Sequence, residues 1–457
     1  MENHEYSVGL DIGTTKIVAI VGRRNDRGKI EVLGVGKAKS LGVHKGIVNN
    51  IAQTISSIKA AVEQAESSAG VSIRKVTVGI AGKHIRSLQH SDYIMREHPD
   101  KYITDEDIEA LKDQVRKLVM LPGEEIIHVL PQDYKVDSEG EIQEPIGMHG
   151  KRLEANFHVV VGQMGSIRNI VRCVREAGLD MEALTLEPLA SSESVLTKEE
   201  KEAGVAIVDI GGGTTDIAIF KDNIIRHTCV IPYGGGIITD DIKEGCSIIE
   251  KHAEQLKVKF GSAVPELEKD STYVTIPGLH GRPDKEISLK SLAQIINARI
   301  EEVLEMVNTE LKAYGAFEQK KKLIAGIVLT GGGSNLKHLR QLANYMTGFD
   351  SRIGFSNEYV SNDKSQQLKG PEYATSIGLL MESLKIRDKN EVNYKQEEVV
   401  EVTNTTTEVD TTNNVTEKEA EAPVEKQIIE ATKQKGGRLT FGQSILEKVK
   451  KFFEEVE

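Results

Sequence analysis

Two similar segments, about two hundred residues apart, most constrain what this chain can fold into. Residues 8–21 and 205–220 each consist of an apolar run, an aspartate, a turn that contains glycine and a second apolar run. Short apolar runs rich in β-branched residues predict buried strands, so each segment is expected to form a strand, a tight turn and a neighbouring strand. When Asp11 is aligned with Asp209, the glycines and apolar positions also align, which predicts an internal repeat at the scale of a domain.

The turn residues of both segments suit phosphate binding. Glycine allows positive φ angles and lets backbone N–H groups approach a ligand with no Cβ in the way. A carboxylate at the end of a strand, here Asp11 or Asp209, can hold the Mg2+ that accompanies phosphates, usually through water molecules. A flexible hairpin would explain a single glycine turn, but two such turns, each with an acid, can hold a polyphosphate and its metal from both sides.

A third glycine turn follows an apolar strand expected at 323–330 and precedes a helical pattern at 336–346. A strand, a glycine turn and a helix in this order present a helix N-terminus to an anion or a nucleotide. The chain contains no G-x-x-x-x-G-K-[ST] signature, so a P-loop nucleotide fold is excluded. The residues of this third turn are Gly331, Gly332, Gly333 and Ser334.

Composition limits the class of protein. A chain of 457 residues suits two lobes, and a net charge of −12 argues against a nucleic-acid binder. The polar N-terminus predicts no signal peptide, and no apolar run approaches the roughly 20 residues that span a bilayer. Three widely spaced cysteines predict buried thiols in a reducing cytosol.

The three turns, in this order and spacing, resemble those of the actin, heat-shock chaperone and sugar-kinase ATPase superfamily. The resemblance implies an α/β fold of two lobes, built from duplicated ribonuclease-H-like domains, with ATP and Mg2+ between them. It implies that Asp11 and Asp209 hold the metal. The residues that it implies at the nucleotide are Asp11, Gly13, Thr14, Thr15, Lys16, Asp209, Gly211, Gly212, Gly213, Thr214, Glu254, Lys257, Gly331, Gly332, Gly333 and Ser334.

The same resemblance suggests catalytic roles. Asp216 matches the position that orients the attacking water, and Glu187 matches an acid that helps to place it; the alternative is that Glu187 merely precedes a helix started by Pro188. Catalysis would be in-line attack on the γ-phosphate, slow at most, with nucleotide acting as a switch for polymerisation. Glu254 and Lys257 match an acid and a lysine at the adenosine, or form an exposed i, i+3 ion pair.

About eighty residues interrupt the first lobe, at 83–162. They predict a small α/β subdomain with a helix at 104–121 and strands at 125–129 and 157–161. Because this segment carries no cluster of acids, histidines or cysteines, we expect it to contact other proteins. The alternative is that the insert is passive and binds no other protein.

The C-terminal region changes in character. Residues 389–436 are rich in Thr, Asn, Glu and Val and predict a disordered linker. Residues 437–457 predict an amphipathic helix that lies in a membrane interface, or else docks on the core or in a partner's groove. Its apolar face consists of Phe441, Ile445, Leu446, Val449, Phe452, Phe453 and Val456.

This combination of parts resembles the FtsA family of actin-like bacterial cell-division proteins. The resemblance covers residues 6–384 and 437–456, including the stretches at 79–82 and 437–443. It implies that the terminal helix attaches filaments of the tubulin-like protein FtsZ to the cytoplasmic face of the inner membrane at the division site. It also implies self-polymerisation, binding of the FtsZ C-terminal peptide at 237–309, and contacts between the insert and other division proteins.

Two other functions share this fold. A sugar or acetate kinase would need a substrate pocket with a catalytic aspartate, and a pilus-assembly scaffold generally lacks the tethered terminal helix. A chaperone would need a further peptide-binding domain. The expected parts are a first-lobe core at 1–82 and 163–203, the insert at 83–162, a second-lobe core at 204–236 and 310–388, a second-lobe outer subdomain at 237–309, the linker at 389–436 and the membrane helix at 437–457.

Overall fold

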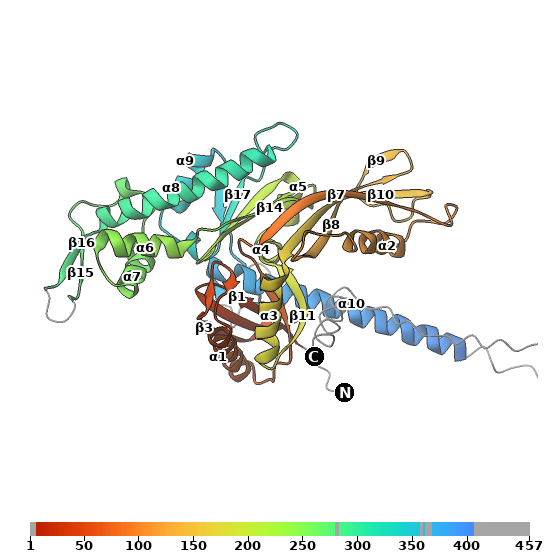
Figure 1. Ribbon diagram of the computed structural model, residues 1–457, viewed down its shortest axis with the longest axis horizontal. Helices are drawn as coiled ribbons and strands as arrows, with labels where there is room; N and C mark the ends of the chain where they lie inside the picture. The colour runs from red at the N-terminus through yellow and green to blue at the C-terminus, as the bar shows by residue number, and fades with distance from the viewer. Residues whose placement is uncertain (1–5, 279–282, 357–359, 362–367, 406–457) are drawn as a thin grey trace, which may run out of the picture. The chain divides into compact units, whose positions relative to one another are not determined.

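Each of the two repeated segments forms the centre of its own five-stranded sheet in the computed structural model of the chain (Figure 1). The structure describes residues 6–278, 283–356, 360–361 and 368–405. The chain divides into two units, Met1–Leu384 and Lys385–Glu457, and both sheets belong to the first unit.

The first-lobe sheet has the strand order β11-β6-β1-β2-β3. Strands β1, β2 and β3 form antiparallel pairs, and β6 and β11 add in parallel on the other side of β1. The strands are β1 (Ser7–Ile12), β2 (Lys16–Arg24), β3 (Ile30–Lys39), β6 (Lys75–Ile80) and β11 (Asp180–Leu186).

The second-lobe sheet repeats this arrangement with the order β14-β13-β12-β17-β18. Its first three strands are antiparallel and its last two are parallel to β12. The predicted internal repeat is therefore confirmed. The strands are β12 (Val205–Ile210), β13 (Thr215–Lys221), β14 (Ile224–Ile231), β17 (Ile327–Thr330) and β18 (Ser351–Ile353).

Helices cover both faces of each sheet. In the first lobe, α1 (Ile51–Ala69) packs on β2 and β3 and against α3 (Met164–Glu176). Helix α1 is amphipathic, begins at the N-cap Asn50 and ends at Gly70, whose φ of 72° is left-handed. In the second lobe, α8 (Leu289–Tyr314) packs against α6 (Gly235–Cys246) and α9 (Leu339–Thr347) over one face of the sheet (Figure 1).

Two hinge helices lie against the remaining faces. These are α4 (Glu187–Val195) and the first part of α10 (Ala374–Thr405). They cross very closely, because a Cβ added at Gly378 would lie 1.8 Å from the carbonyl oxygen of Ala190. Glycine at that position therefore lets the two backbones touch where the lobes meet.

The insert is a four-stranded antiparallel sheet with one helix. Its order is β7-β10-β8-β9, and its strands are β7 (Ile85–Met95), β8 (Glu124–Val136), β9 (Glu139–Ile142) and β10 (Arg152–Gln163). The expected helix is present but shorter, as α2 (Asp105–Arg116), and starts with a capping box at Thr104. The prediction missed β7 and β9, because β7 alternates half-buried and exposed side chains and has no continuous apolar run.

The insert also packs on the second lobe. The edge strand β14 contacts β7, β8 and β10. At this contact, which we call the insert–β14 interface, Thr228 is bonded by two insert side chains: the Nε2 of His158 lies 2.9 Å from its Oγ1, and Ser87 donates to its carbonyl oxygen at 3.2 Å. Gln132 donates to the carbonyl oxygen of Ile225. The insert is thus continuous in sequence with the first lobe and packed against the second.

Shorter elements complete the first unit. The outer part of the second lobe contains α7 (Glu250–Phe260), the 3-10 turn η1 (Pro265–Leu267) and a hairpin of β15 (Tyr273–Ile276) and β16 (Lys285–Ser288). A small hairpin of β4 (Val43–His44) and β5 (Ile47–Val48) follows β3. Helix α5 (Lys198–Ala203) precedes β12.

Two expectations need correction. The third glycine turn does not lead directly into a helix: it forms the 3-10 turn η2 (Gly332–Asn335), and α9 begins only at Leu339, because His338 adopts a left-handed φ of 64°. The expected linker starts at residue 389, but α10 continues through Thr405, in a stretch rich in the good helix formers Glu, Lys and Gln.

The expected membrane helix at 437–457 and most of the expected linker lie outside the described residues. Across the part of the chain that the structure does describe, every helix is too short or too polar to cross a bilayer.

Candidate functional site

The two phosphate-type turns meet face to face at the junction of the lobes. A Cβ added at Gly212 would lie 1.8 Å from the Oγ1 of Thr15, and one added at Gly213 would lie 2.5 Å from the Oγ1 of Thr14. Only glycine fits at this approach. Between the described residues, no hydrogen bond uses the backbone N–H groups of these four turn residues, so they can donate to an anion.

Asp11 is the second-last residue of β1 and lies beside these turns. It is buried, and Ser376 of α10 donates a hydrogen bond to its Oδ2 at 2.9 Å. Burial raises the pKa of Asp11, whereas Lys16 and the Ser376 hydroxyl lower it and Asp209 raises it further. Asp11 therefore lies in the field of a second acid and one cation.

Asp209 occupies the equivalent position at the end of β12. Its Oδ2 accepts hydrogen bonds from Ser191 of α4 at 2.8 Å and from Thr375 of α10 at 3.1 Å. The two hydroxyls also lie 3.0 Å from each other. Burial raises the pKa of Asp209, opposed by these hydroxyls and then by Lys16. Both hinge helices thus hold one carboxylate in place.

Asp216 and Glu187 complete an acidic cluster. Thr214 donates to the Oδ2 of Asp216 at 2.9 Å. The other carboxylate oxygen of Asp216, the buried Oδ1, has no partner among the described residues. Burial, and then Asp209, raise the pKa of Asp216 to about 7. Glu187 opens α4; its pKa is raised well above the usual range by burial and then by Asp11, Asp216 and Asp209. The structure therefore brings together all four predicted acids.

Lys16 supplies positive charge beside Asp11. Its amine donates to the carbonyl oxygen of Glu372 and lies 4.6 Å from the centroid of the Tyr373 ring. Burial lowers the pKa of Lys16, and the Asp11 carboxylate opposes this shift. The Tyr373 hydroxyl also accepts from Lys37 at 3.3 Å. This side of the junction therefore holds two cations at Tyr373, of which Lys16 also lies near Asp11.

Glu254 and Lys257 of α7 form an ion pair of 2.7 Å. The pair is not simply exposed: the Lys257 amine is largely buried and also donates to the carbonyl oxygen of Gly235 and to Thr239, each at 2.7 Å. In turn, Gly235 donates its N–H to the carbonyl oxygen of Gly211 at 2.8 Å. Lys257 therefore fastens α7 to the first turn of α6, which is itself fastened to the second-lobe turn.

The third glycine turn packs against the end of β12. A Cβ added at Gly331, whose φ is 81°, would lie 2.2 Å from the Oδ1 of Asp209, and one at Gly333 would lie 2.3 Å from the side chain of Ile210. Gly332 is exposed. The hydroxyl of the buried Ser334 donates to the carbonyl oxygen of Thr330, which closes the 3-10 turn. This turn therefore reaches the same acid as the phosphate-type turns.

The donor set fits a hydrated metal and a polyphosphate. Among the described residues, no three His, Cys, Asp or Glu side chains converge closely enough to ligate a metal directly. Asp11 and Asp209 are nevertheless buried acids beside free N–H donors. Mg2+ usually keeps several waters and binds one or two carboxylates together with phosphates, which matches this arrangement.

Sequence reasoning missed the hydroxyl groups that hold the acids. Ser191, Thr375 and Ser376 occur in hinge segments that are otherwise apolar and small, Ala-Ser-Ser and Ala-Thr-Ser. The one signal was that both segments place adjacent hydroxyl residues near the predicted lobe junction. Lys45 was also missed: it lies in the turn between β4 and β5, which carries no motif, yet a Cβ added at Gly213 would lie 2.9 Å from its Cα.

Comparisons with known proteins agree with this architecture. Residues 206–378 match the family model "Cell division protein FtsA", and residues 82–161 match "SHS2 domain inserted in FTSA". The cell division protein FtsA of Pseudomonas aeruginosa is 40% identical over 385 residues, which is 84% of this chain and 90% of the relative. That of Escherichia coli K12 is 35% identical over 378 residues, 82% of this chain and 89% of the relative.

A solved structure shares the fold at low identity. The structure "PilM-PilN type IV pilus biogenesis complex" superposes with a TM-score of 0.60 and 16% identity, and covers 83% of this chain and 98% of its own. That likeness concerns the fold alone, whereas the relatives above share the sequence over most of both chains. The family model, the inserted domain and these two relatives together establish that this chain belongs to the FtsA family of cell division proteins.

Proposed function

We propose that this chain is an ATP-binding, actin-like division protein that polymerises and tethers FtsZ filaments to the cytoplasmic face of the bacterial inner membrane. We infer ATP binding chiefly from the two glycine turns, which each follow an aspartate, meet at the junction of the lobes and have backbone N–H donors with no described partner. Backbone N–H donors in such turns suit phosphate oxygens, and the buried Asp11 and Asp209 suit a hydrated Mg2+.

Each residue has a distinct part in this proposal. The backbone of residues 13–15 and 211–213 binds phosphates, with help from the hydroxyls of Thr14, Thr15 and Thr214. Bound Mg2+ would offset phosphate charge. Asp216 accepts a hydrogen bond from the attacking water, because its Oδ1 has no other partner among the described residues. Glu187, whose pKa is raised, keeps its proton more readily and can donate a hydrogen bond. Slow turnover suits a nucleotide that acts as a polymerisation switch.

The test of ATP binding is Asp209→Asn in the full chain. The amide keeps the size of the side chain and can accept from Ser191, but it lacks the charge that holds a hydrated metal. We expect the affinity for Mg-ATP to fall at least tenfold, measured by calorimetry, with the melting temperature little changed. The control is Asp270→Asn, at a side chain that is 83% exposed. Unchanged affinity in the Asp209 variant would overturn the assignment.

Membrane attachment is the second part of the proposal. It is supported by the apolar face of the sequence at 437–457 and by membership of the FtsA family. The test is co-sedimentation with vesicles containing anionic lipid, in the presence of ATP, of the full chain and of a chain that ends at Lys435. Sedimentation of the full chain alone is the expected result. If neither sediments, the terminal helix serves a protein partner instead.

Partner binding is the third part. We assign the FtsZ C-terminal peptide to the outer part of the second lobe, 237–309, and other division proteins to the insert. Family membership supports these assignments over a small-molecule kinase or a pilus scaffold. The test is fluorescence anisotropy with a labelled FtsZ C-terminal peptide and a charge-reversal variant on the outer subdomain. Phosphoryl transfer to a sugar or to acetate would instead support the kinase.

A further inference from the structure

A loop that belongs to neither phosphate-type turn reaches the same junction. It is the turn between β4 and β5, whose tip is Lys45 and Gly46. Both tip residues have left-handed backbones, with φ of 49° and 73°. The loop is expected neither from the repeat nor from a motif, so its position at the junction needs another explanation.

The tip of this loop touches both turns. The N–H of Gly46 donates to the Oγ1 of Thr14 at 3.2 Å, on the first-lobe turn. A Cβ added at Gly213, on the second-lobe turn, would lie 2.9 Å from the Cα and 3.0 Å from the N of Lys45. The backbone of Lys45 is therefore fixed within van der Waals contact of the residues that are proposed to hold phosphate.

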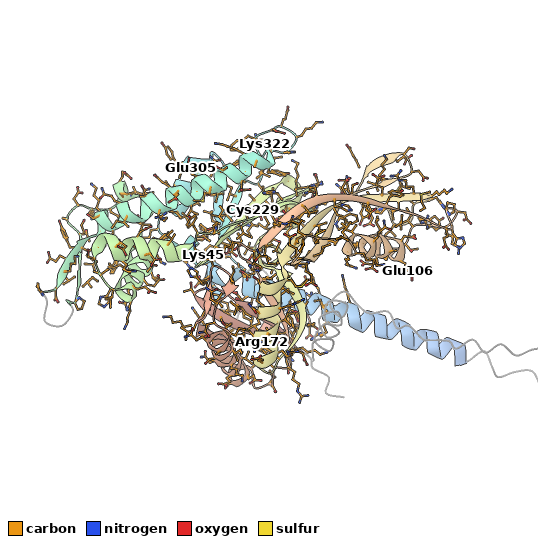
Figure 2. All side chains as sticks on the ribbon, in the orientation of Figure 1. Lys45, Glu106, Arg172, Cys229, Glu305 and Lys322 are labelled. Atoms are coloured by element: carbon orange, nitrogen blue, oxygen red, sulfur yellow. The ribbon has the colours of Figure 1, made fainter. Side chains whose placement is uncertain are left out.

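The Lys45 side chain reaches from the first lobe to the second. Its amine lies 4.9 Å from the centroid of the ring of Tyr233, which lies between β14 and the first turn of α6. Figure 2 labels Lys45 where the first lobe meets the second. Within the described residues, its amine forms no ion pair and no hydrogen bond, whereas the amines of Lys16 and Lys257 donate to carbonyl oxygens.

Lys45 is a half-buried residue, and its ammonium group, whose one described partner is an aromatic face, is available for a stronger partner. Cation–π contacts at partly exposed sites are weak, and a charge-assisted hydrogen bond to phosphate is stronger. Lys is a flexible point charge with three donors. It can therefore leave the ring for a phosphate oxygen while the loop backbone stays in place.

We infer that Lys45 is a nucleotide-discriminating residue, whose amine binds the terminal phosphate of a nucleoside triphosphate and returns to the Tyr233 ring when the diphosphate is bound. This inference rests on the proposed binding of ATP at the junction. It goes beyond that proposal because Lys45 lies outside both turns and makes the site prefer the triphosphate. The added phosphate brings negative charge near a cluster of four acids, so a cation that binds this phosphate contributes to that preference.

The test compares Lys45→Met with Lys45→Arg in the full chain. Affinities for a non-hydrolysable ATP analogue and for ADP are measured by calorimetry with Mg2+. Lys45→Met is expected to weaken binding of the analogue at least tenfold and binding of ADP less than twofold, while Lys45→Arg retains part of the preference. The control is Lys322→Met, at an exposed lysine on the second lobe (Figure 2).

Each other outcome overturns the inference. Equal loss of both affinities makes Lys45 a general binding or folding residue, and no loss removes it from the site. If the unmodified chain binds neither nucleotide, the proposed function fails and this inference fails with it. If the unmodified chain binds ATP and the Lys45 variant shows no selective loss, only this inference fails. The two failures are therefore distinguishable. A melting curve for each variant separates unfolding from lost binding.

A second variant tests the aromatic partner. Tyr233→Leu removes the ring that holds the amine when no terminal phosphate is present. The preference for the ATP analogue over ADP is therefore expected to rise about two- to fivefold, because the diphosphate state loses a contact that the triphosphate state does not use. A reduced preference would contradict the proposed exchange of partners.

Discussion

Asp216 pairs directly with Asp209 across the β12–β13 ladder, whereas the same position of the first-lobe ladder pairs Asp11 with Val18. The two lobes share strand order and register, so the first lobe serves as an internal control for the second. The first lobe forms the same ladder with a buried valine, Val18, at this position. The acid in the second lobe therefore has a reason other than folding, and its raised pKa shows that burial opposes its charge.

Asp216→Val is expected to stabilise the chain free of metal and nucleotide, more at high pH than at low pH. Because the folded pKa of about 7 lies above the unfolded value, the folded state binds more protons and stability falls as pH rises from about 4 to 7. The variant should remove a fall on the order of 2–3 kcal/mol between pH 5 and pH 8. Urea unfolding with a chelator measures this. Parallel pH profiles of the variant and the unmodified chain would contradict it.

His158→Gln is expected to reduce acid sensitivity at the insert–β14 interface. Burial, and then His227, lower the pKa of His158 to about 4. The unfolded chain therefore binds more protons than the folded chain between pH 6.5 and 4, and stability falls as pH falls through that range. The single histidine accounts for about 2 kcal/mol between pH 7.5 and pH 5. Unfolding at both pH values tests this, with the exposed His44→Gln as control. Equal acid sensitivity of both variants would sink the assignment.

Gly378→Ala is expected to separate the hinge helices. The added methyl group would lie 1.8 Å from the carbonyl oxygen of Ala190, so the helices must move. A cost of about 1–3 kcal/mol is typical of such overpacking, and nucleotide affinity should also fall because the same helices carry Ser191 and Thr375. Chemical unfolding and calorimetry measure the two effects. The matched control is Gly165→Ala in α3, where a Cβ meets open space; similar behaviour of the two variants would disprove the steric argument.

Arg96→Met is expected to loosen the insert alone. The Arg96 side chain is 5% exposed and donates to Asp107 and to the carbonyl oxygens of Lys101, Tyr102 and Gly150. Its removal takes the donor from three carbonyl oxygens and the cation from Asp107, at a cost of about 2–4 kcal/mol. Hydrogen exchange should increase within 83–162 and not in the lobes. Arg172→Met, at an exposed i, i+4 pair, is the control. Exchange that increases equally in all parts would show that the insert does not unfold separately.

The acids and turns of the site could be predicted because their chemistry is local. Asp11 and Asp209 lie near the end of a buried strand, and the glycines follow within the same short segment, so the repeat shows which residues correspond. Strand order and register then place them at one junction. The insert's helix was also predictable, because its first turn carries a cap and three acids.

Other parts depend on contacts between distant segments. Ser191 and Thr375 hold one carboxylate from two helices that are separated by most of the second lobe in sequence. No local pattern identifies either as a partner of Asp209. The break before α9 depends on the backbone of His338 and on a bridge between Ser262 and Lys337, which a periodic apolar pattern does not report. Strand β7 is missed for a similar reason, since it is completed by pairing with β10.

The attachment of the insert to β14 has a mechanical consequence. The insert is joined to the first lobe by two peptide connections and to the second lobe by the insert–β14 interface, so it connects the two lobes. A force applied to the insert by a partner is therefore divided between both lobes. The covalent connections do not break under such a force, whereas the hydrogen bonds at Thr228 can, so tension on the insert acts first on the insert–β14 interface.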